Sequence, residues 1–273
     1  MMNTLSPRKT PASVLNKLKM SPGGFYAATP RLAYHTEYFS GGRDGNILIT
    51  KGLDHDEEFI IRGVFQISRD DFCFTPDGNF NPANVFHGRL ADLKLSCQLI
   101  AGCSKAFEFS SDDFSAVVSN LSAFEKSAPR ERSHETFSVI RDTIGRRSIK
   151  LTHRLFEAID RDQDDNTSND SSNSSTNASH LQDIISSHNI RLLPAYDENH
   201  ILIPPLQYEA KLRGALVEVH MAFCHTKKSK CDIFDAVLQE LIVLLPPAPM
   251  SSSPFKCRHL NDRPYTEQYN KGN

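Results

Sequence analysis

The chain of 273 residues carries 31 Lys and Arg against 33 Asp and Glu, a formal net charge of −2, and 39% of its residues are hydrophobic. This near-neutral balance gives no overall attraction to DNA, RNA or an anionic membrane, so any nucleic-acid surface has to be a local patch. No apolar run reaches the roughly 18 residues of a membrane span, and the N-terminus lacks the apolar core of a secretion signal. We therefore expect an intracellular protein, cytoplasmic or nuclear, whose six cysteines are reduced thiols.

The first half of the chain is typical of short strands that follow a disordered arm. Residues 1–30 contain scattered Pro, Lys and Arg without sustained periodicity, which predicts a disordered N-terminal arm. Alternating apolar segments then recur between turn residues such as Gly, Asp and Pro, and they predict strands at 46–50, 59–67, 88–100, 106–109 and 114–124. Many short strands separated by turns are typical of a barrel or a sandwich.

The second half contains a polar interruption. We predict strand in the middle of the ambiguous stretch 128–159 and helix near Leu155. Within 160–179, 17 of 20 residues are Asp, Asn, Ser or Thr, so this segment has almost nothing to bury and is predicted to be a disordered insertion. A short helix from residue 181, strands up to residue 245 and a disordered tail over 248–273 complete the prediction.

Two stretches repeat one β-type pattern. Gly-Arg-Leu-Ala-Asp-Leu-Lys-Leu (88–95) matches Gly-Ala-Leu-Val-Glu-Val-His-Met (214–221), and each is followed by Phe-x-Ala-Val, at 114–117 and 234–237. Two amphipathic strands can share such alternation without being related, but a duplication would make them equivalent. We predict a mainly β chain with minor α, built as two pseudo-repeated, barrel-like and OB-like units. The first spans 31–127 and the second spans 134–247, and the termini are disordered.

The sequence contains no recognisable catalytic or metal-binding motif. Residues 160–164 resemble the first half of a calcium-binding EF-hand loop, but Ser171 stands where a bidentate Glu closes such a loop. Cys224, Cys231 and the Cys-Arg-His of 257–259 lack the tight spacing of structural zinc ligands. Nucleophile elbows, phosphate-binding glycine loops and His-Glu-x-x-His are missing. We therefore expect no catalytic residues, no metal and no cofactor, and the sequence favours a non-enzyme.

The most informative charge cluster is predicted at the tip of the last hairpin. Lys227, Lys228 and Lys230 lie within five residues there, and Arg146 and Arg147 rank next. In small five-stranded barrels, such cations beside exposed aromatic strand residues bind single-stranded nucleic acid. Lysines are also common at exposed hairpins because they keep strand edges soluble. The five residues are our candidate nucleic-acid-binding residues.

The C-terminal strands carry a resemblance. The segments Leu-Arg-Gly-Ala-Leu-Val-Glu-Val-His (212–220), Phe-Asp-Ala-Val (234–237) and Ile-Val-Leu-Leu-Pro (242–246) resemble the C-terminal strand pair of uncharacterised proteins predicted from mushroom-forming fungi. Those proteins have no known activity, so the resemblance implies no site residues. The same strand pair is similar to the closing part of an OB-type barrel.

Two functional hypotheses follow. The first is a non-catalytic protein-interaction or scaffold module with an unknown protein partner, consistent with near-neutral charge and flexible tails. The alternative is a weak single-stranded nucleic-acid-binding OB-like protein; neither involves a membrane. A contiguous positive groove with exposed aromatics would favour the second hypothesis, and an apolar patch of several hundred Å² would favour the first.

Overall fold

The computed structural model describes residues 10–42, 45–52, 57–75, 90–131, 133–143, 145–159 and 186–249, and these residues are mainly β, as predicted. The helices are α1 (Pro11–Met20), α2 (Phe109–Asp112), α3 (Phe114–Ser127) and α5 (Tyr208–Leu212). The strands are β1 (Phe25–Tyr26), β2 (Thr36–Gly42), β3 (Gly45–Thr50), β4 (Ile61–Ile67), β5 (Lys94–Ile100), β6 (Glu135–Phe137), β7 (Ile140–Thr143), β8 (Arg146–Arg154), β9 (Phe156–Ala158), β10 (His188–Ile190), β11 (Ala195–Tyr196), β12 (Leu216–Lys228) and β13 (Cys231–Leu245). Short 3₁₀ turns lie at Leu32–His35, Leu90–Asp92, Lys105–Phe107 and Pro205–Gln207.

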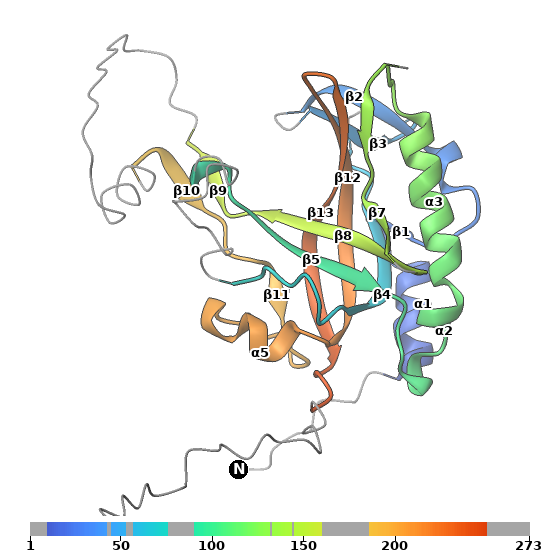
Figure 1. Cartoon of the computed structure of the whole chain (residues 1–273). Helices are drawn as coiled ribbons and strands as arrows, with labels where there is room; N and C mark the ends of the chain where they lie inside the picture. The colour runs from blue at the N-terminus through green and yellow to red at the C-terminus, as the bar shows by residue number, and fades with distance from the viewer. Residues whose placement is uncertain are drawn as a thin grey trace, which may run out of the picture.

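Five strands form a closed ring. β4 pairs with β5, β5 with β8, β8 with β13, β13 with β12, and β12 returns to β4. All of these pairings are antiparallel except the parallel pair β8–β13. Because the last pairing meets the first strand, the sheet closes into a small barrel of the OB-like kind predicted. β5 and β8 cross the long β12–β13 hairpin (Figure 1).

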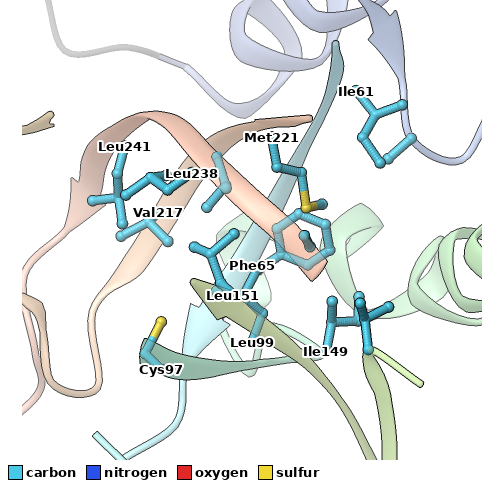
Figure 2. Close-up of a cluster of buried hydrophobic side chains, with 14 of the residues drawn as sticks. Ile61, Phe65, Cys97, Leu99, Ile149, Leu151, Val217, Met221, Leu238 and Leu241 are labelled. Carbon is cyan, nitrogen blue, oxygen red and sulfur yellow. The ribbon is translucent and has the colours of Figure 1, made fainter. Parts of the chain in front are cut away.

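Alternation along the strands fills the barrel with apolar side chains. Leu95, Cys97 and Leu99 of β5 are buried, while the residues between them remain partly exposed. Ile149 and Leu151 of β8 point into the same core. Figure 2 shows Cys97, Leu99, Ile149 and Leu151 in one cluster with labelled residues from β4, β12 and β13. The outward residues of β5 and β8 are thereby free to carry charge.

The predicted equivalence of the two repeat copies is wrong. Residues 114–117 open helix α3, whereas their supposed counterparts 234–237 lie in β13. Val117, Leu121 and Phe124 recur at three- and four-residue spacing, so they make one helical face, and this face packs on the core. Within the described part of the first copy, Leu90–Asp92 form a 3₁₀ turn rather than a strand. The barrel draws β4 and β5 from the first predicted unit and β8, β12 and β13 from the second.

Three local predictions are also corrected. Residues 10–30 are ordered: Thr10 caps α1 by accepting a hydrogen bond from the backbone N–H of Ser13, and Val14 and Leu18 are buried. The segment 106–109 is helical rather than a strand. Leu155 lies at a bend between β8 and β9 rather than in a helix. The predicted disorder of 1–9, 160–179 and 250–273 lies outside the described residues.

No helix in the described part of the chain has both the length and the apolar character that crossing a membrane requires.

Candidate nucleic-acid interface

The outer face of β5 and β8 is basic and polar. Along β8, Arg146, Ser148, Lys150 and Arg154 alternate with the inward residues, so they share the outward face. The antiparallel register sets Lys94 of β5 directly beside Arg154, and Gln98 beside Lys150. A row of cations separated by hydrogen-bonding side chains therefore runs across two neighbouring barrel strands.

A groove continues this face toward the tip of the β12–β13 hairpin. It has a volume of about 420 Å³, within the usual range for small-ligand pockets. Strands β6 and β7 form one side, because β6 pairs with β13 and β7 pairs with β8. Its lining residues are Phe137, Ser138, Arg141, Lys150, Lys228, Ser229, Cys231, Ile233, Phe234 and Asp235.

The groove carries an excess of positive charge. Arg141, Lys150 and Lys228 line it, and no acidic side chain in the described ranges forms an ion pair with any of them. Asp235 is the only acid among the lining residues. Lys94 Nζ in β5 donates a hydrogen bond of 2.6 Å to Asp235 Oδ2, so this carboxylate already has a cationic partner. Among the described residues, these three cations therefore line the groove without an acidic partner.

An aromatic ring is exposed beside these cations. Phe137, in β6, retains 38% of its accessible surface and lines the groove. Ile233 from β13 lies in the same lining and is half-buried. An exposed ring next to cations offers a stacking surface for a planar base while the cations bind phosphates.

The predicted site residues fall on different sides of the barrel. Lys228 lines the groove, and Arg146 lies on the same outward face of β8 as Lys150. Lys227 points away, with its Nζ 3.6 Å from Glu131 Oε1. Arg147 also points away, with its Nε 3.6 Å from Asp142 Oδ2. Lys230 is exposed at the turn itself. Their part in binding stays a prediction.

Sequence reasoning missed the residues that complete the groove, namely Arg141, Lys150 and Phe137. For Lys150 a signal existed, since basic and polar residues alternate with apolar ones from Arg146 to Arg154. Phe137 lies in the three-residue strand β6, which pairs with β13, and Arg141 lies in the four-residue strand β7, which pairs with β8. No local pattern predicts such pairing.

A buried polar cluster lies beside the tip of the β12–β13 hairpin. His225 Nε2 lies 2.8 Å from Asp232 Oδ1, and both side chains are almost completely buried. Asn46 Nδ2 lies 3.3 Å from His225 Nδ1, so the amide donates there and the Nε2–H donates to Asp232. Burial raises the pKa of Asp232, but the hydrogen bond from His225 and the favourable electrostatic interactions with His225 and His134 outweigh it and hold the pKa below its usual range. The strands that present Lys227 and Lys228 are thus held by specific contacts.

Comparisons with known proteins give distant likenesses of fold. No protein-family model and no curated protein matches the chain. Among solved structures, gp2.5, a single-stranded DNA-binding protein encoded by bacteriophage T7, is 10% identical, with a TM-score of 0.38 and coverage of 71% of this chain and 96% of its own. The single-stranded DNA-binding protein of bacteriophage Enc34 in complex with single-stranded DNA is 8% identical, with a TM-score of 0.38 and coverage of 79% and 98%.

The described residues hold no group of three or more His, Cys, Asp or Glu side chains that could bind a metal ion. Cys224 is buried, and Cys231 lines the groove. The segment that resembles half an EF-hand loop, at 160–164, and the cysteine and histidine of 257–259 lie outside the described residues.

Proposed function

We propose that this chain binds single-stranded nucleic acid in the groove between β6, β7, β8 and the β12–β13 hairpin. One observation carries the proposal: Arg141, Lys150 and Lys228 line the same groove as the exposed ring of Phe137, and no acidic side chain among the described residues pairs with them. Cations bind the phosphate backbone, and an aromatic ring stacks with a base of any sequence. A base is available for such stacking when it is unpaired, which favours a single strand over a duplex.

The local character of the charge agrees with a modest affinity. The net charge of −2 gives little long-range attraction to a polyanion, so binding depends on the few cations of the groove. Five-stranded barrels of this kind bind oligonucleotides on the face of their second and third strands and at the loop between the fourth and fifth. Here those strands are β5 and β8, and that loop is the Lys-rich hairpin tip.

The first test separates phosphate contacts from base stacking. Fluorescence anisotropy with labelled single-stranded DNA and RNA would be measured at about 50 and 200 mM salt. We expect the double variant Arg141→Ala/Lys150→Ala to weaken binding and to reduce the salt slope by about 1.4, because each single-strand phosphate contact contributes about 0.7. We expect Phe137→Ala to cost about 1–3 kcal/mol of binding and to leave the salt slope unchanged.

A matched control carries the same loss of charge at a distance from the groove. Lys51 and Lys105 are both exposed, and neither lines the groove. Lys51 follows β3. Lys105 lies two residues before Phe107, which packs in the cluster of Leu216, the first residue of β12. The double variant Lys51→Ala/Lys105→Ala should bind like the wild-type protein. Equal weakening by this control would move the site away from the groove, and a wild-type protein that binds neither nucleic acid at low salt would end the proposal.

The acid of the groove provides a test in the opposite direction. Asp235→Asn removes the only carboxylate of the lining and releases Lys94, whose Nζ is 2.6 Å from it. We expect tighter binding and a steeper salt dependence than in the wild-type protein, because Lys94 becomes available to a phosphate. The same anisotropy titration measures the affinity and its salt dependence. An affinity lower than that of the wild-type protein would contradict the binding of nucleic acid in this groove.

A protein-interaction role is the second candidate. It is favoured by exposed apolar side chains between β11 and α5, where Ile201 and Leu206 retain 62% and 90% of their accessible surface. Should oligonucleotides fail to bind, this is the surface to examine with Leu206→Ser.

A further inference from the structure

A second basic pocket lies on the opposite side of β6 from the groove. Successive residues of a strand point to opposite faces. Phe137 of β6 accordingly lines the groove, while Thr136 lines the second pocket. The hairpin repeats this division, with Lys228 in the groove and Lys227 directed toward Glu131 of the second pocket. The two pockets therefore flank the same pair of elements, β6 and the hairpin tip.

The second pocket is positively charged despite its acid. It has a volume of about 330 Å³ and is lined by Lys126, Ala128, Arg130, Glu131, His134 and Thr136. Glu131 is engaged twice: Lys227 Nζ lies 3.6 Å from one carboxylate oxygen and His134 Nε2 lies 3.2 Å from the other. Lys126 and Arg130 are exposed and form no ion pair within the described ranges.

Because the Glu131 carboxylate already contacts Lys227 and His134, Lys126 and Arg130 are available to bind an anion. His134 lines the pocket, and its largely buried ring lies 3.5 Å from Asp232 Oδ2 through Nδ1. The exposed Lys230 occupies the turn that separates this pocket from the groove. Cations thus continue from Arg141 and Lys150, past the hairpin tip, to the far side of β6.

We infer that this pocket is a second phosphate-binding subsite, and that a bound single strand passes from the groove across the hairpin tip to Lys126 and Arg130. The inference rests on the proposed function and extends it, because it fixes the path and the length of nucleic acid that the chain covers. Short oligonucleotides occupy the groove, where a base can stack on Phe137. Only longer ones reach the second subsite as well.

The test compares two lengths of oligo(dT), about 5 and about 15 nucleotides, which span the usual site sizes of one such barrel. We expect Lys126→Ala/Arg130→Ala to leave the affinity for the short oligonucleotide within about twofold. For the long one we expect roughly tenfold weaker binding at about 0.1 M salt and a salt slope smaller by about 1.4. The groove variant Arg141→Ala/Lys150→Ala should weaken both lengths, and Lys51→Ala/Lys105→Ala should weaken neither.

The outcomes distinguish the two proposals. If the groove variant loses affinity while Lys126→Ala/Arg130→Ala binds the long oligonucleotide like the wild-type protein, only the second subsite is wrong. Equal weakening of short and long oligonucleotides by Lys126→Ala/Arg130→Ala would also overturn it. If the wild-type protein binds neither length at low salt, the proposed function is wrong and the subsite is rejected with it. Unchanged far-UV circular dichroism and melting temperature would establish that both double variants are folded.

Discussion

Asp232 is fully buried close to the tip of the β12–β13 hairpin, and its neighbours keep it charged. An isolated buried carboxylate would be neutralised by protonation, because burial disfavours the charged form. Here the donor His225 Nε2–H and the nearby His134 reverse that effect, and the pKa of Asp232 falls below its usual range. The contacts of Asp232 thus link the two strands of the hairpin to Glu131 and His134, and His225 extends them to Asn46 of β3.

This depressed pKa predicts how stability depends on pH. Because the folded pKa is lower than the unfolded value of about 3.9, the contribution of Asp232 is present above pH 4 and is lost as the pH falls through the folded pKa. Asp232→Ala should cost about 3–5 kcal/mol at pH 7, because it leaves a buried histidine without its partner. It should also show a smaller further loss between pH 4 and pH 2 than the wild-type protein. Urea unfolding at several pH values measures both.

The matched control for this prediction is Asp142→Ala, which removes an exposed carboxylate from its contact with Arg147. Surface pairs of this kind contribute at most about 1 kcal/mol, so its stability should stay close to that of the wild-type protein. If Asp232→Ala were no more destabilising than this control, the buried cluster would not anchor the hairpin.

At the scale of the element, α1 is an integral part of the molecule. Val14 and Leu18 lie one turn apart on the helix. Together with Tyr26, Val64 and Leu216 they belong to a second apolar cluster, separate from the main core. Lys17 Nζ lies 3.3 Å from Glu218 Oε1, a buried carboxylate on β12. The helix therefore covers an apolar patch of the barrel wall.

We expect Leu18→Ala to lower the free energy of unfolding by about 2–5 kcal/mol, because it removes buried methyl groups and leaves a cavity. Asn16→Ala, on the exposed side of the same helix, should change it by less than about 0.5 kcal/mol. Chemical denaturation of the two variants measures the difference. Equal stability would mean that α1 is only loosely attached, as the sequence predicted for residues 1–30.

At the scale of the whole molecule, the closed ring joins strands from both predicted units around one core. Such a core has no boundary at which half of it could unfold independently. We therefore expect one cooperative transition, monitored equally by circular dichroism and by tyrosine fluorescence. Leu99→Ala in β5 and Leu238→Ala in β13 should each shift that whole transition. Two transitions, each shifted by a different variant, would instead indicate two independent units.

The sequence by itself determined the class of the fold and the long C-terminal hairpin. Alternation over 216–221 and the apolar, Val-containing segments around it identify β12 and β13, and proline at 246 and 247 ends the second of them. The same information led to a wrong result at 114–124. Phe114, Ala116 and Val118 are two residues apart, as in a strand, whereas Val117, Leu121 and Phe124 have the three- and four-residue spacing of a helix. The choice was decided by the core, which buries one helical face of α3, with Phe124 lying 5.7 Å from Phe223 between ring centroids.

Only the tertiary structure decided how the candidate site is composed. The sequence indicated that cations cluster near the hairpin tip, and alternation would have separated Lys227 from Lys228. It could not indicate that β7 pairs with β8 and β6 with β13, which brings Arg141 and Phe137 to Lys228. Strand pairing between distant segments depends on the closure of the whole barrel rather than on any local pattern of residues. For that reason a chain with a net charge of −2 can present a positive groove that its composition does not reveal.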